Sequence, residues 1–173
     1  MIIKKEDFNF ENFKKNVLEE KVFVYPTDTI YGLGCDATNF KAVNKIRNLK
    51  NRDKNPFSIA APDKEWIKEN CFAKSLDRLP GPYTLILKKR KDCVADNVSF
   101  NNTLGVRIPD NWFKDVVKEL KIPIVSTSVN LTGEKPMREL KDLKLKVDFI
   151  IYEGKLNNNP STIITDKKIK KRE

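Results

Sequence analysis

The sequence predicts an α/β (α+β layered) fold, with a twisted mixed sheet flanked by helices. Segments with the spacing of amphipathic helices alternate with short apolar runs of strand length. Several connections between them are short, which favours a sheet that mixes parallel and antiparallel neighbours. A length of 173 residues corresponds to one ordinary domain, so we expect residues 1–173 to fold as a single domain.

The first half of the chain is expected to open with a helix followed by a strand. Phe10, Phe13 and Val17 have helical spacing, and Asn9 or Asn12 is a suitable N-cap. The elements expected next are a strand at 22–25, a glycine-containing turn at 32–34, a helix at 39–50 with Phe40, Val43, Ile46 and Leu49 on one side, a charged loop at 50–55 and a strand at 56–61.

The second half is expected to add three short helices and several strands. Asp63 is expected to cap one helix and Asp110 to begin another, whose apolar face includes Trp112 and Val116. The remaining expected elements are strands at 83–87, 105–108, 122–125, 149–152 and 162–164, a short helix after the polar stretch 126–136, and a basic end at 167–172.

The chain carries a strong positive charge. Lys and Arg total 34 against 24 Asp and Glu, which gives a net charge of +10 at neutral pH. Such a field attracts polyanions, including nucleic acids and nucleotide phosphates. The alternative is a lysine-rich surface without a dedicated partner, and charge alone does not distinguish the two.

The absence of histidine excludes several kinds of catalytic site. Neither a Ser-His-Asp or Cys-His system nor a His-ligated zinc is available. Cys35, Cys71 and Cys93 contain no CxxC pair, which argues against a disulfide framework or a zinc ribbon and favours a reducing, cytoplasmic location. No stretch approaches the ~20 apolar residues of a membrane span, so we expect no membrane partner.

Four polar segments interrupt the apolar pattern, each at the end of a predicted strand or helix. Their sequences are YPTDTIYGLG (25–34), KNR (50–52), PGPYT (80–84) and STSVNLTG (126–133). Ligands of open α/β sheets bind at strand ends, so we expect the four segments to contribute to one site. The segments contain neither a Walker loop nor a GxSxG nucleophile elbow.

Cationic side chains in and near these segments suit a bound triphosphate. Lys50 and Arg52 lie where a helix gives way to a loop, and a lysine beside a forked guanidinium can stabilise charge on phosphate oxygens. The alternative is an exposed helix end, where the helix dipole favours cations. Arg107 stands inside an apolar strand, so it either acts on a ligand or forms a structural ion pair.

The neutral polar residues favour ligand binding over hydrolysis. Ser126, Thr127, Ser128, Asn130 and Thr132 offer donors and acceptors without a general base; a helix cap is the alternative. In the first segment, the two glycines at 32 and 34 permit a close backbone approach to a ligand, or they serve an ordinary turn.

The chain resembles the YrdC-like family. The resemblance rests on these segments in this order, together with the Arg-x-Pro pattern at 107–109 and the Ser-x-Asn pattern at 128–130. The resemblance extends from about Val22 to the C-terminus. It implies an L-threonylcarbamoyladenylate synthase, a nucleotidyltransferase that uses L-threonine, bicarbonate and ATP with Mg²⁺ and releases pyrophosphate. The product serves threonylcarbamoyladenosine formation in tRNA.

The resemblance also implies roles for individual residues, with no metal ligand assigned. It implies catalytic roles for Lys50, Arg52, Ser128 and Asn130. It implies that the same four residues bind ATP together with Asn55, Thr84, Arg107, Ser161 and Arg172. The positions implied for threonine are Thr29, Lys88 and Gly105. The loop at 53–56 departs from the family pattern, in which a proline often follows the arginine directly.

Two other functions stay open at this point. One is a module of the same fold that binds double-stranded RNA or tRNA, in agreement with the positive charge. The other is a paralogue acting on a different carbamoyl or acyl adenylate, since its phosphate site would look the same. For the synthase, the resemblance implies a downstream partner, a tRNA threonylcarbamoyl transferase. Longer relatives carry an additional C-terminal domain.

Overall fold

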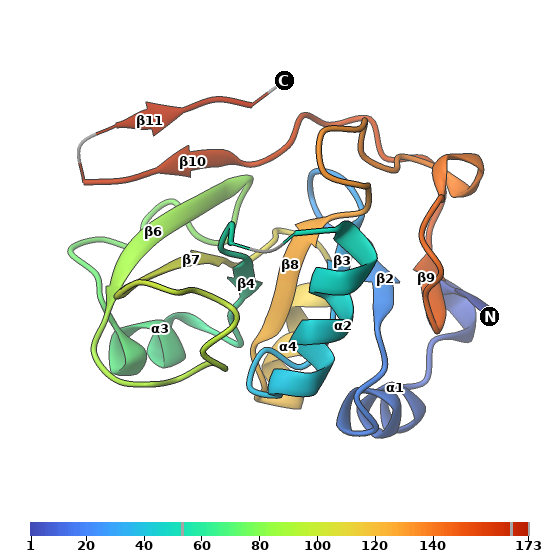
Figure 1. The fold of residues 1–173 in the computed structure, drawn as a ribbon, viewed down its shortest axis with the longest axis horizontal. Helices are drawn as coiled ribbons and strands as arrows, with labels where there is room; N and C mark the ends of the chain where they lie inside the picture. The colour runs from blue at the N-terminus through green and yellow to red at the C-terminus, as the bar shows by residue number, and fades with distance from the viewer. Residues whose placement is uncertain (53, 167, 173) are drawn as a thin grey trace.

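A computed structural model describes residues 1–52, 54–166 and 168–172 of the chain (Figure 1). The strands, in chain order, are β1 (Ile2–Lys4), β2 (Phe23–Tyr25), β3 (Gly32–Gly34), β4 (Ser58–Ala60), β5 (Cys71–Phe72), β6 (Tyr83–Lys89), β7 (Thr103–Arg107), β8 (Ile124–Ser128), β9 (Phe149–Tyr152), β10 (Thr162–Ile164) and β11 (Ile169–Lys170). The helices are α1 (Phe10–Leu18), α2 (Phe40–Lys50), α3 (Lys64–Asn70) and α4 (Phe113–Leu120), with 3₁₀ turns η1 (Lys5–Asp7) and η2 (Leu140–Asp142).

The strands form one mixed sheet, which confirms the predicted fold class. Their order is β1-β9-β2-β3-β8-β4-β7-β6-β10-β11, and β5 pairs with one end of β6. The central strand β4 shows both pairing modes. Its Ile59 pairs with Val106 of β7 in parallel and with Val125 of β8 antiparallel. This order brings polar segments from distant parts of the chain onto neighbouring strands.

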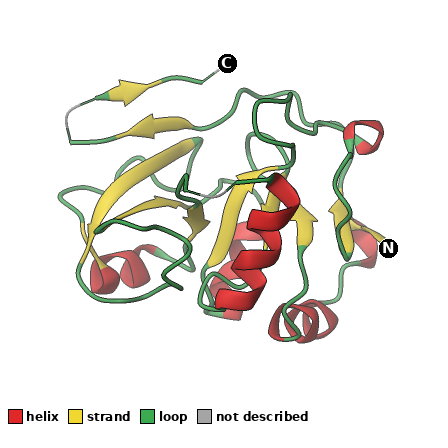
Figure 2. Cartoon of the chain, viewed as in Figure 1, coloured by secondary structure: helices red, strands yellow, loops and turns green. Residues whose placement is uncertain are grey.

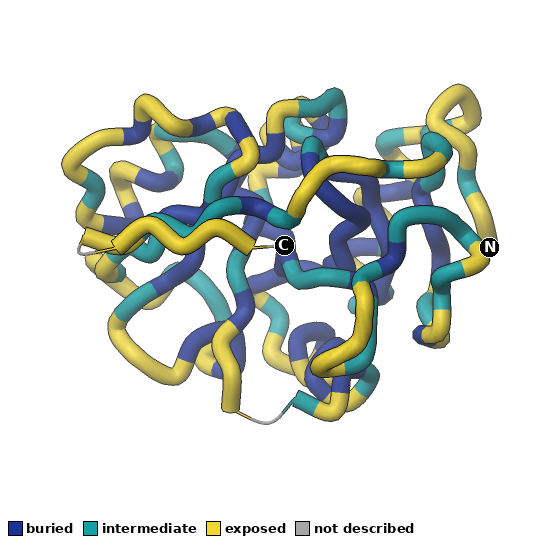
Figure 3. The backbone as a smooth tube through the Cα atoms, turned by 90° about the horizontal axis from the view of Figure 1, so that it is seen from above, coloured by how far each residue is buried: buried dark blue, intermediate teal, exposed yellow. Residues whose placement is uncertain are grey.

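Helices cover both faces of the sheet, so the sheet is the middle layer (Figures 1 and 2). Successive residues of β2 point to opposite faces. Phe23 belongs to the buried cluster that includes Phe13 of α1 and Phe113 of α4, while Val24 belongs to the other cluster, which includes Val43 of α2. Buried backbone accordingly runs through the centre of the molecule, and exposed backbone lies around it (Figure 3).

Several predicted elements are confirmed with their caps. Asn9 accepts a hydrogen bond from the Asn12 backbone N–H at 2.9 Å and so caps α1. Asp63 accepts one from the Trp66 N–H at 2.7 Å and caps α3. The helix predicted at 39–50 is α2, although its Phe40 is exposed rather than part of the apolar side.

Other predictions are wrong for local reasons. Residues 32–34 form β3 instead of a turn, and residues 126–128 extend β8 into the expected polar loop. Asp110 does not begin α4; it pairs with Lys114 at 2.6 Å, and the helix starts at Phe113. The helix expected after residue 136 is the single turn η2. The pattern gave no indication of the short strands β1, β5 and β11. Within the basic end, Lys167 lies outside the described residues.

The two glycines of β3 accommodate an aromatic ring from the neighbouring strand. Gly32 pairs with Tyr25, whose side chain is fully buried. A Cβ at Gly32 would lie 2.8 Å from Cζ of this ring, and a Cβ at Gly34 would lie 2.8 Å from its Cε1. Burial raises the pKa of Tyr25 to about 12, and its hydroxyl donates to the Val125 carbonyl at 3.3 Å. Close packing in the sheet, rather than a turn, therefore explains these glycines.

We expect Gly32→Ala to lower the free energy of unfolding by ~1–3 kcal/mol, because the added methyl group overpacks the Tyr25 ring. Urea unfolding measures this cost. The same substitution in a Tyr25→Leu background should cost less, since the clashing ring atoms are gone. An equal cost in both backgrounds would show that another contact limits position 32.

Candidate active site

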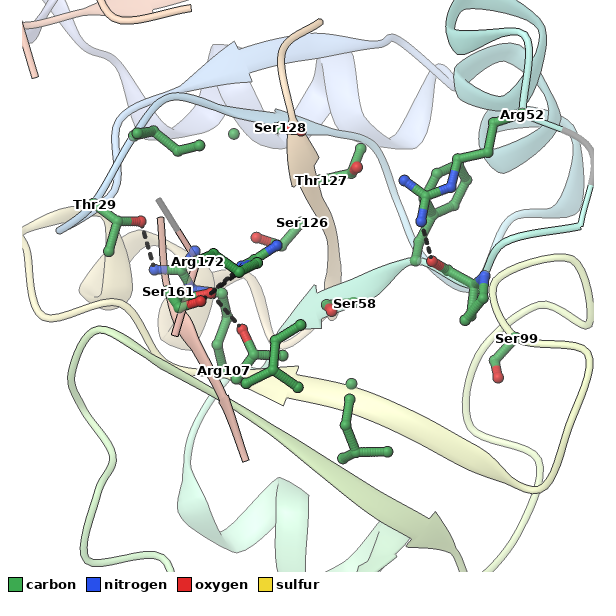
Figure 4. A pocket seen from close by; sticks show the side chains of 18 of the residues that line it. Thr29, Arg52, Ser58, Ser99, Arg107, Ser126, Thr127, Ser128, Ser161 and Arg172 are labelled. Atoms are coloured by element: carbon green, nitrogen blue, oxygen red, sulfur yellow. Dashed lines mark hydrogen bonds between the residues drawn. The ribbon is translucent and has the colours of Figure 1, made fainter. Parts of the chain in front are cut away.

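A cavity of about 280 Å³ lies on one face of the sheet, and its floor crosses four adjacent strands (Figure 4). Strand register aligns Ser126 of β8 with Ser58 of β4, Ser58 with Gly105 of β7, and Gly105 with Ile86 of β6. All four residues line the cavity. At the centre of this row, a Cβ on Gly105 would lie 2.5 Å from Ser58 Oγ, so glycine keeps the floor level.

Alternate residues of the same strands complete the walls. Thr84 on β6, Arg107 on β7 and Ser128 on β8 line the cavity because each is two residues from a floor position. The opposite face of these strands carries core residues such as Leu85 and Val106. The cavity is thus the polar face of strands whose other face is buried in the core.

Arg107 is held by a buried ion pair at the cavity wall. Its Nη2 donates to Asp28 Oδ1 at 2.6 Å and to Thr29 Oγ1 at 3.2 Å, and both charged side chains are less than one-tenth exposed. Thr29 is oriented in turn by Thr27, since their hydroxyl oxygens are 2.9 Å apart. The structural ion pair that the sequence left open is therefore present, and Arg107 also lines the cavity; its action on a ligand stays a prediction.

Arg172 reaches the cavity from the end of the chain. Strand β10 pairs in parallel with β6, and β11 pairs antiparallel with β10 (Figure 1); Figure 4 shows Arg172 beside Ser161 in the cavity. Arg172 Nε donates to the Ser161 carbonyl at 2.8 Å and Nη2 donates to Ser161 Oγ at 2.5 Å. Ser161 Oγ is also 2.7 Å from Thr84 Oγ1. Three residues implied for ATP binding therefore form one hydrogen-bonded chain along the cavity wall.

Arg52 follows the C-terminal end of α2 and lines the opposite side of the cavity. Asn51 ends the helix with a left-handed conformation, φ 48°. Arg52 Nη2 then donates to the Pro56 carbonyl at 2.8 Å, and its guanidinium lies 5.1 Å from the centre of the Phe57 ring. Burial, with the nearby Arg47, lowers the pKa of Arg52.

Lys50 is not the exposed helix-end cation that the sequence allowed; it is 1% exposed. Its ammonium donates to the Ser128 carbonyl at 2.5 Å, to the Asn130 carbonyl at 2.7 Å and to Asn130 Oδ1 at 2.9 Å. Ser128 Oγ donates to the same Asn130 Oδ1 at 2.6 Å. The four residues implied as catalytic are therefore close together, but Lys50 and Asn130 stand behind the cavity lining, which includes Arg52 and Ser128.

Two further predicted site residues do not line this cavity. Asn55 is exposed, and its carbonyl accepts hydrogen bonds from Arg47 and Arg52. Lys88 is exposed at the far end of β6, with its ammonium 6.0 Å from the centre of the Phe72 ring. Their predicted roles in binding ATP and threonine stay predictions. Ser58, outside the motifs, is a cavity residue that the sequence reasoning missed.

Arg47 is a second buried cation that the sequence reasoning missed. Its guanidinium lies between the Phe57 and Phe100 rings, at 4.5 and 4.6 Å, and donates to the carbonyls of Asn97 and Arg52. It thereby shapes the loop that presents Arg52. Helical periodicity could have identified it, because positions 43, 46, 47 and 50 fall on one buried side of α2.

The cavity is built to hold an anion. Three guanidinium groups line it, those of Arg52, Arg107 and Arg172, and no carboxylate occurs among its described lining residues. Burial and the charges of Arg107 and Arg52 lower the pKa of Arg172, which places the three cations within electrostatic reach of one another. An anionic ligand relieves this repulsion. In the described ranges, no group of three or more Cys, Asp or Glu residues is arranged to hold a metal.

Comparison with known proteins identifies the family. A family model for Sua5, YciO and YrdC proteins, described as telomere recombination, matches residues 15–172. The chain belongs to the Sua5/YciO/YrdC family. A protein of Methanocaldococcus jannaschii is 38% identical over 167 residues, which cover 89% of this chain and 78% of the relative. A Wigglesworthia glossinidia brevipalpis protein named threonylcarbamoyl-AMP synthase is 34% identical over 177 residues, covering 91% of both chains.

Solved structures of the Sua5/YciO/YrdC family share the fold. The crystal structure of P. abyssi Sua5 complexed with L-threonine has a TM-score of 0.80 and 27% identity, covering 97% of this chain and 55% of Sua5. E. coli YciO has a TM-score of 0.83 and 25% identity, covering 99% of this chain and 94% of YciO. The chain thus spans about half of Sua5 and nearly all of YciO. In the part of the chain that the structure describes, no helix is long and apolar enough to cross a membrane.

We expect Lys50→Met to destabilise the protein by ~1–3 kcal/mol at neutral pH, because it leaves the acceptors of Ser128 and Asn130 without their donor. Burial, with the nearby Arg52, lowers the pKa of Lys50 from 10.5 to about 8. Between these pH values the unfolded chain binds more protons at this side chain, so raising the pH favours the folded state. The stability advantage of the wild type over Lys50→Met should therefore grow from pH 8 towards 10.5.

Urea unfolding at several pH values measures this difference. Lys45→Met on the same helix is the matched control, because Lys45 is exposed and its ammonium contacts Glu20 at the surface, the carbonyl at 2.9 Å and Oε2 at 3.6 Å. The control should show little loss and no growth with pH. A pH-independent difference for Lys50→Met would mean that Lys50 titrates as an exposed lysine.

Proposed function

We propose that this chain is a threonylcarbamoyl-AMP synthase, with residues 1–173 acting as one catalytic domain. It belongs to a family in which a relative 34% identical over 91% of both chains carries this name. Sua5, with the same fold, has been crystallised with L-threonine. The observation that carries the proposal is the convergence of Arg52, Arg107 and Arg172 on one carboxylate-free cavity among the described residues. The negative charge of a nucleoside triphosphate complements these three guanidinium groups.

The reaction requires no protein nucleophile. Bicarbonate and the threonine amine combine, with loss of water, into N-carboxythreonine. An oxygen of its N-carboxylate (carbamate) group attacks the α-phosphorus of ATP. A new P–O bond forms as the bond to the β-phosphate bridging oxygen breaks, and pyrophosphate leaves with that electron pair. Positioning and charge stabilisation suffice for such a displacement, in agreement with a chain that lacks histidine.

The three guanidinium groups have different hydrogen-bond partners, so we assign them different roles in the reaction. Arg52 and Arg172 donate to uncharged oxygens, so their positive charges are available to the triphosphate and to pyrophosphate as it leaves. Arg107 is partly neutralised by Asp28 and adjoins Thr29, which suits the carboxylate end of threonine. The floor hydroxyls of Ser58 and Ser126 offer neutral hydrogen bonds to the remaining polar groups.

Mg²⁺ enters this proposal as part of the substrate, bound to ATP. The described cavity lining offers hydroxyl groups and no carboxylate, and Asp28 is already paired with Arg107. These residues do not fit a dedicated protein site for the ion, so its ligands would be phosphate oxygens and water. When bound, Mg²⁺ neutralises phosphate charge.

The product implies further partners. A mixed carbamoyl–phosphate anhydride is reactive, so we propose that a downstream tRNA threonylcarbamoyl transferase consumes it and that tRNA is the final acceptor. The net charge of +10 is compatible with direct tRNA contact.

Pyrophosphate release should require ATP, bicarbonate and L-threonine together. L-serine should react more slowly by ~1–3 kcal/mol, about 5- to 150-fold, the range for one methyl group in a binding pocket. Coupled pyrophosphate detection and mass spectrometry of the adenylate measure this. Faster turnover of another amino acid would indicate a paralogue with a different acyl adenylate. Binding of double-stranded RNA without pyrophosphate release would indicate an RNA-binding module.

Arg52→Lys should lower kcat/KM for ATP by ~100- to 1000-fold, because it keeps the charge but removes the forked pair of N–H donors. Steady-state kinetics at varied ATP measure the effect. Arg78→Lys is the matched control, since Arg78 is exposed and its guanidinium lies 5.2 Å from the centre of the Tyr83 ring, outside the cavity lining. Similar kinetics for both variants would remove Arg52 from the nucleotide site.

A further inference from the structure

Two of the three cysteines meet at a point that the cavity does not use. Cys71 opens β5, where it pairs with Lys89 at the end of β6. The chain then turns back at Arg90, whose N–H donates to the Asn70 carbonyl at 2.8 Å and whose Nε donates to the Cys71 carbonyl at 3.0 Å. These bonds hold the start of the β6–β7 connection against β5, and Cys93 follows three residues later.

Cys71 and Cys93 are neighbours. Each thiol is the largest influence on the pKa of the other, and Cys93 packs against the apolar cluster that contains Cys71. Both cysteines are free thiols. Cys71 is fully buried, whereas Cys93 is partly exposed. A reagent from solvent therefore has access to Cys93 but not to Cys71.

The surroundings favour the thiolate of Cys93. The hydrogen bond from Cys71, followed by the charges of Lys89 and Lys91, lowers the pKa of Cys93 despite partial burial. The same hydrogen bond, followed by burial, raises the pKa of Cys71, which keeps its proton. A partly exposed thiol in a positive environment, with a second thiol in contact, is the arrangement of oxidation-sensitive cysteines.

Cys35 is an internal comparison for this pair. It is fully buried, and its Sγ donates to the Asp36 carbonyl at 3.5 Å. Burial, with Asp36, raises the pKa of Cys35 well above its usual range. Cys35 therefore combines burial with a disfavoured thiolate, and we expect it to be inert towards oxidants.

We propose that Cys93 and Cys71 form an oxidisable pair that a hydroperoxide converts into an intramolecular disulfide. The Cys93 thiolate attacks the terminal peroxide oxygen, the O–O bond breaks, and Cys93 becomes a sulfenic acid as water or an alcohol leaves with a proton. Cys71 sulfur then attacks the Cys93 sulfur, the S–O bond breaks, and the Cys71 proton leaves with the hydroxide as water. The peroxide is reduced by two electrons and the two thiols are oxidised.

The disulfide would join β5 covalently to the β6–β7 connection. That connection also carries Asn97 and Ser99. Asn97 accepts the hydrogen bond from Arg47 at 2.7 Å, and Ser99 lines the cavity. Oxidation at Cys93 therefore anchors one end of a segment whose other end contributes to the candidate active site. The modification itself is independent of the proposed reaction.

The test is treatment of the full chain with hydrogen peroxide, followed by thiol titration and intact and peptide mass spectrometry. The wild type should lose two of its three free thiols, lose the mass of two hydrogen atoms, and yield one linked peptide pair containing Cys71 and Cys93. Dithiothreitol should restore all three thiols. Cys35→Ala is the matched control and should still form the linkage.

Two variants separate the steps. Cys93→Ser, at the partly exposed position, should form no intramolecular disulfide. Cys71→Ser should leave a Cys93 sulfenic acid that dimedone captures; if this buried substitution prevents folding, the wild-type linkage and Cys93→Ser decide alone. Retention of three thiols by the wild type, a linkage to Cys35, or only intermolecular disulfides would overturn the proposal.

Discussion

The candidate site depends on one buried ammonium group. Lys50, the last residue of α2, donates to the carbonyl of Ser128 at the end of β8 and to the carbonyl and amide oxygens of Asn130 just beyond it. In the opposite direction, the Thr132 hydroxyl donates a hydrogen bond to the Lys50 carbonyl at 3.0 Å. Two motifs almost eighty residues apart are thereby fixed to each other. Because Arg52 follows Lys50 and Ser128 precedes Asn130, the same bonds set the positions of two residues that line the cavity.

The cationic side chains near Lys50 differ in their hydrogen-bond partners. The partners determine whether each cation stabilises the fold or stays available to a ligand. Lys50 donates to backbone carbonyls and to the amide oxygen of Asn130, Arg47 donates to backbone carbonyls, and both organise the structure. Arg107 is paired with a carboxylate, whereas Arg52 and Arg172 are held by neutral oxygens and keep their charge for a ligand. A buried charge that is hydrogen-bonded but not neutralised raises the local potential, which a bound phosphate lowers.

The sequence predicted the fold class and most longer elements because helical and strand periodicities are local properties. Asn9 and Asp63 were identifiable as caps for the same reason. Sheet order is non-local, so Ser58 could not be placed beside Gly105 and Ser126 from spacing alone. The glycines of β3 were misread because their cause, the Tyr25 ring, lies on another strand. The burial of Lys50 was not foreseen, because the burial of a helix end depends on the loop that covers it.

The floor of the cavity has a consequence for how such a protein can diversify. Along β6 and β7 its residues alternate with residues that build the core, so the two faces of these strands can change separately. A substitution at Ile86 or Ser126 alters the depth and polarity of the floor while the arginines around it stay in place. Under the proposed function, the side chains that would shape the acyl pocket are different from the arginines that would bind phosphate. A change in acyl-group selectivity therefore does not require a change in the anion-binding residues.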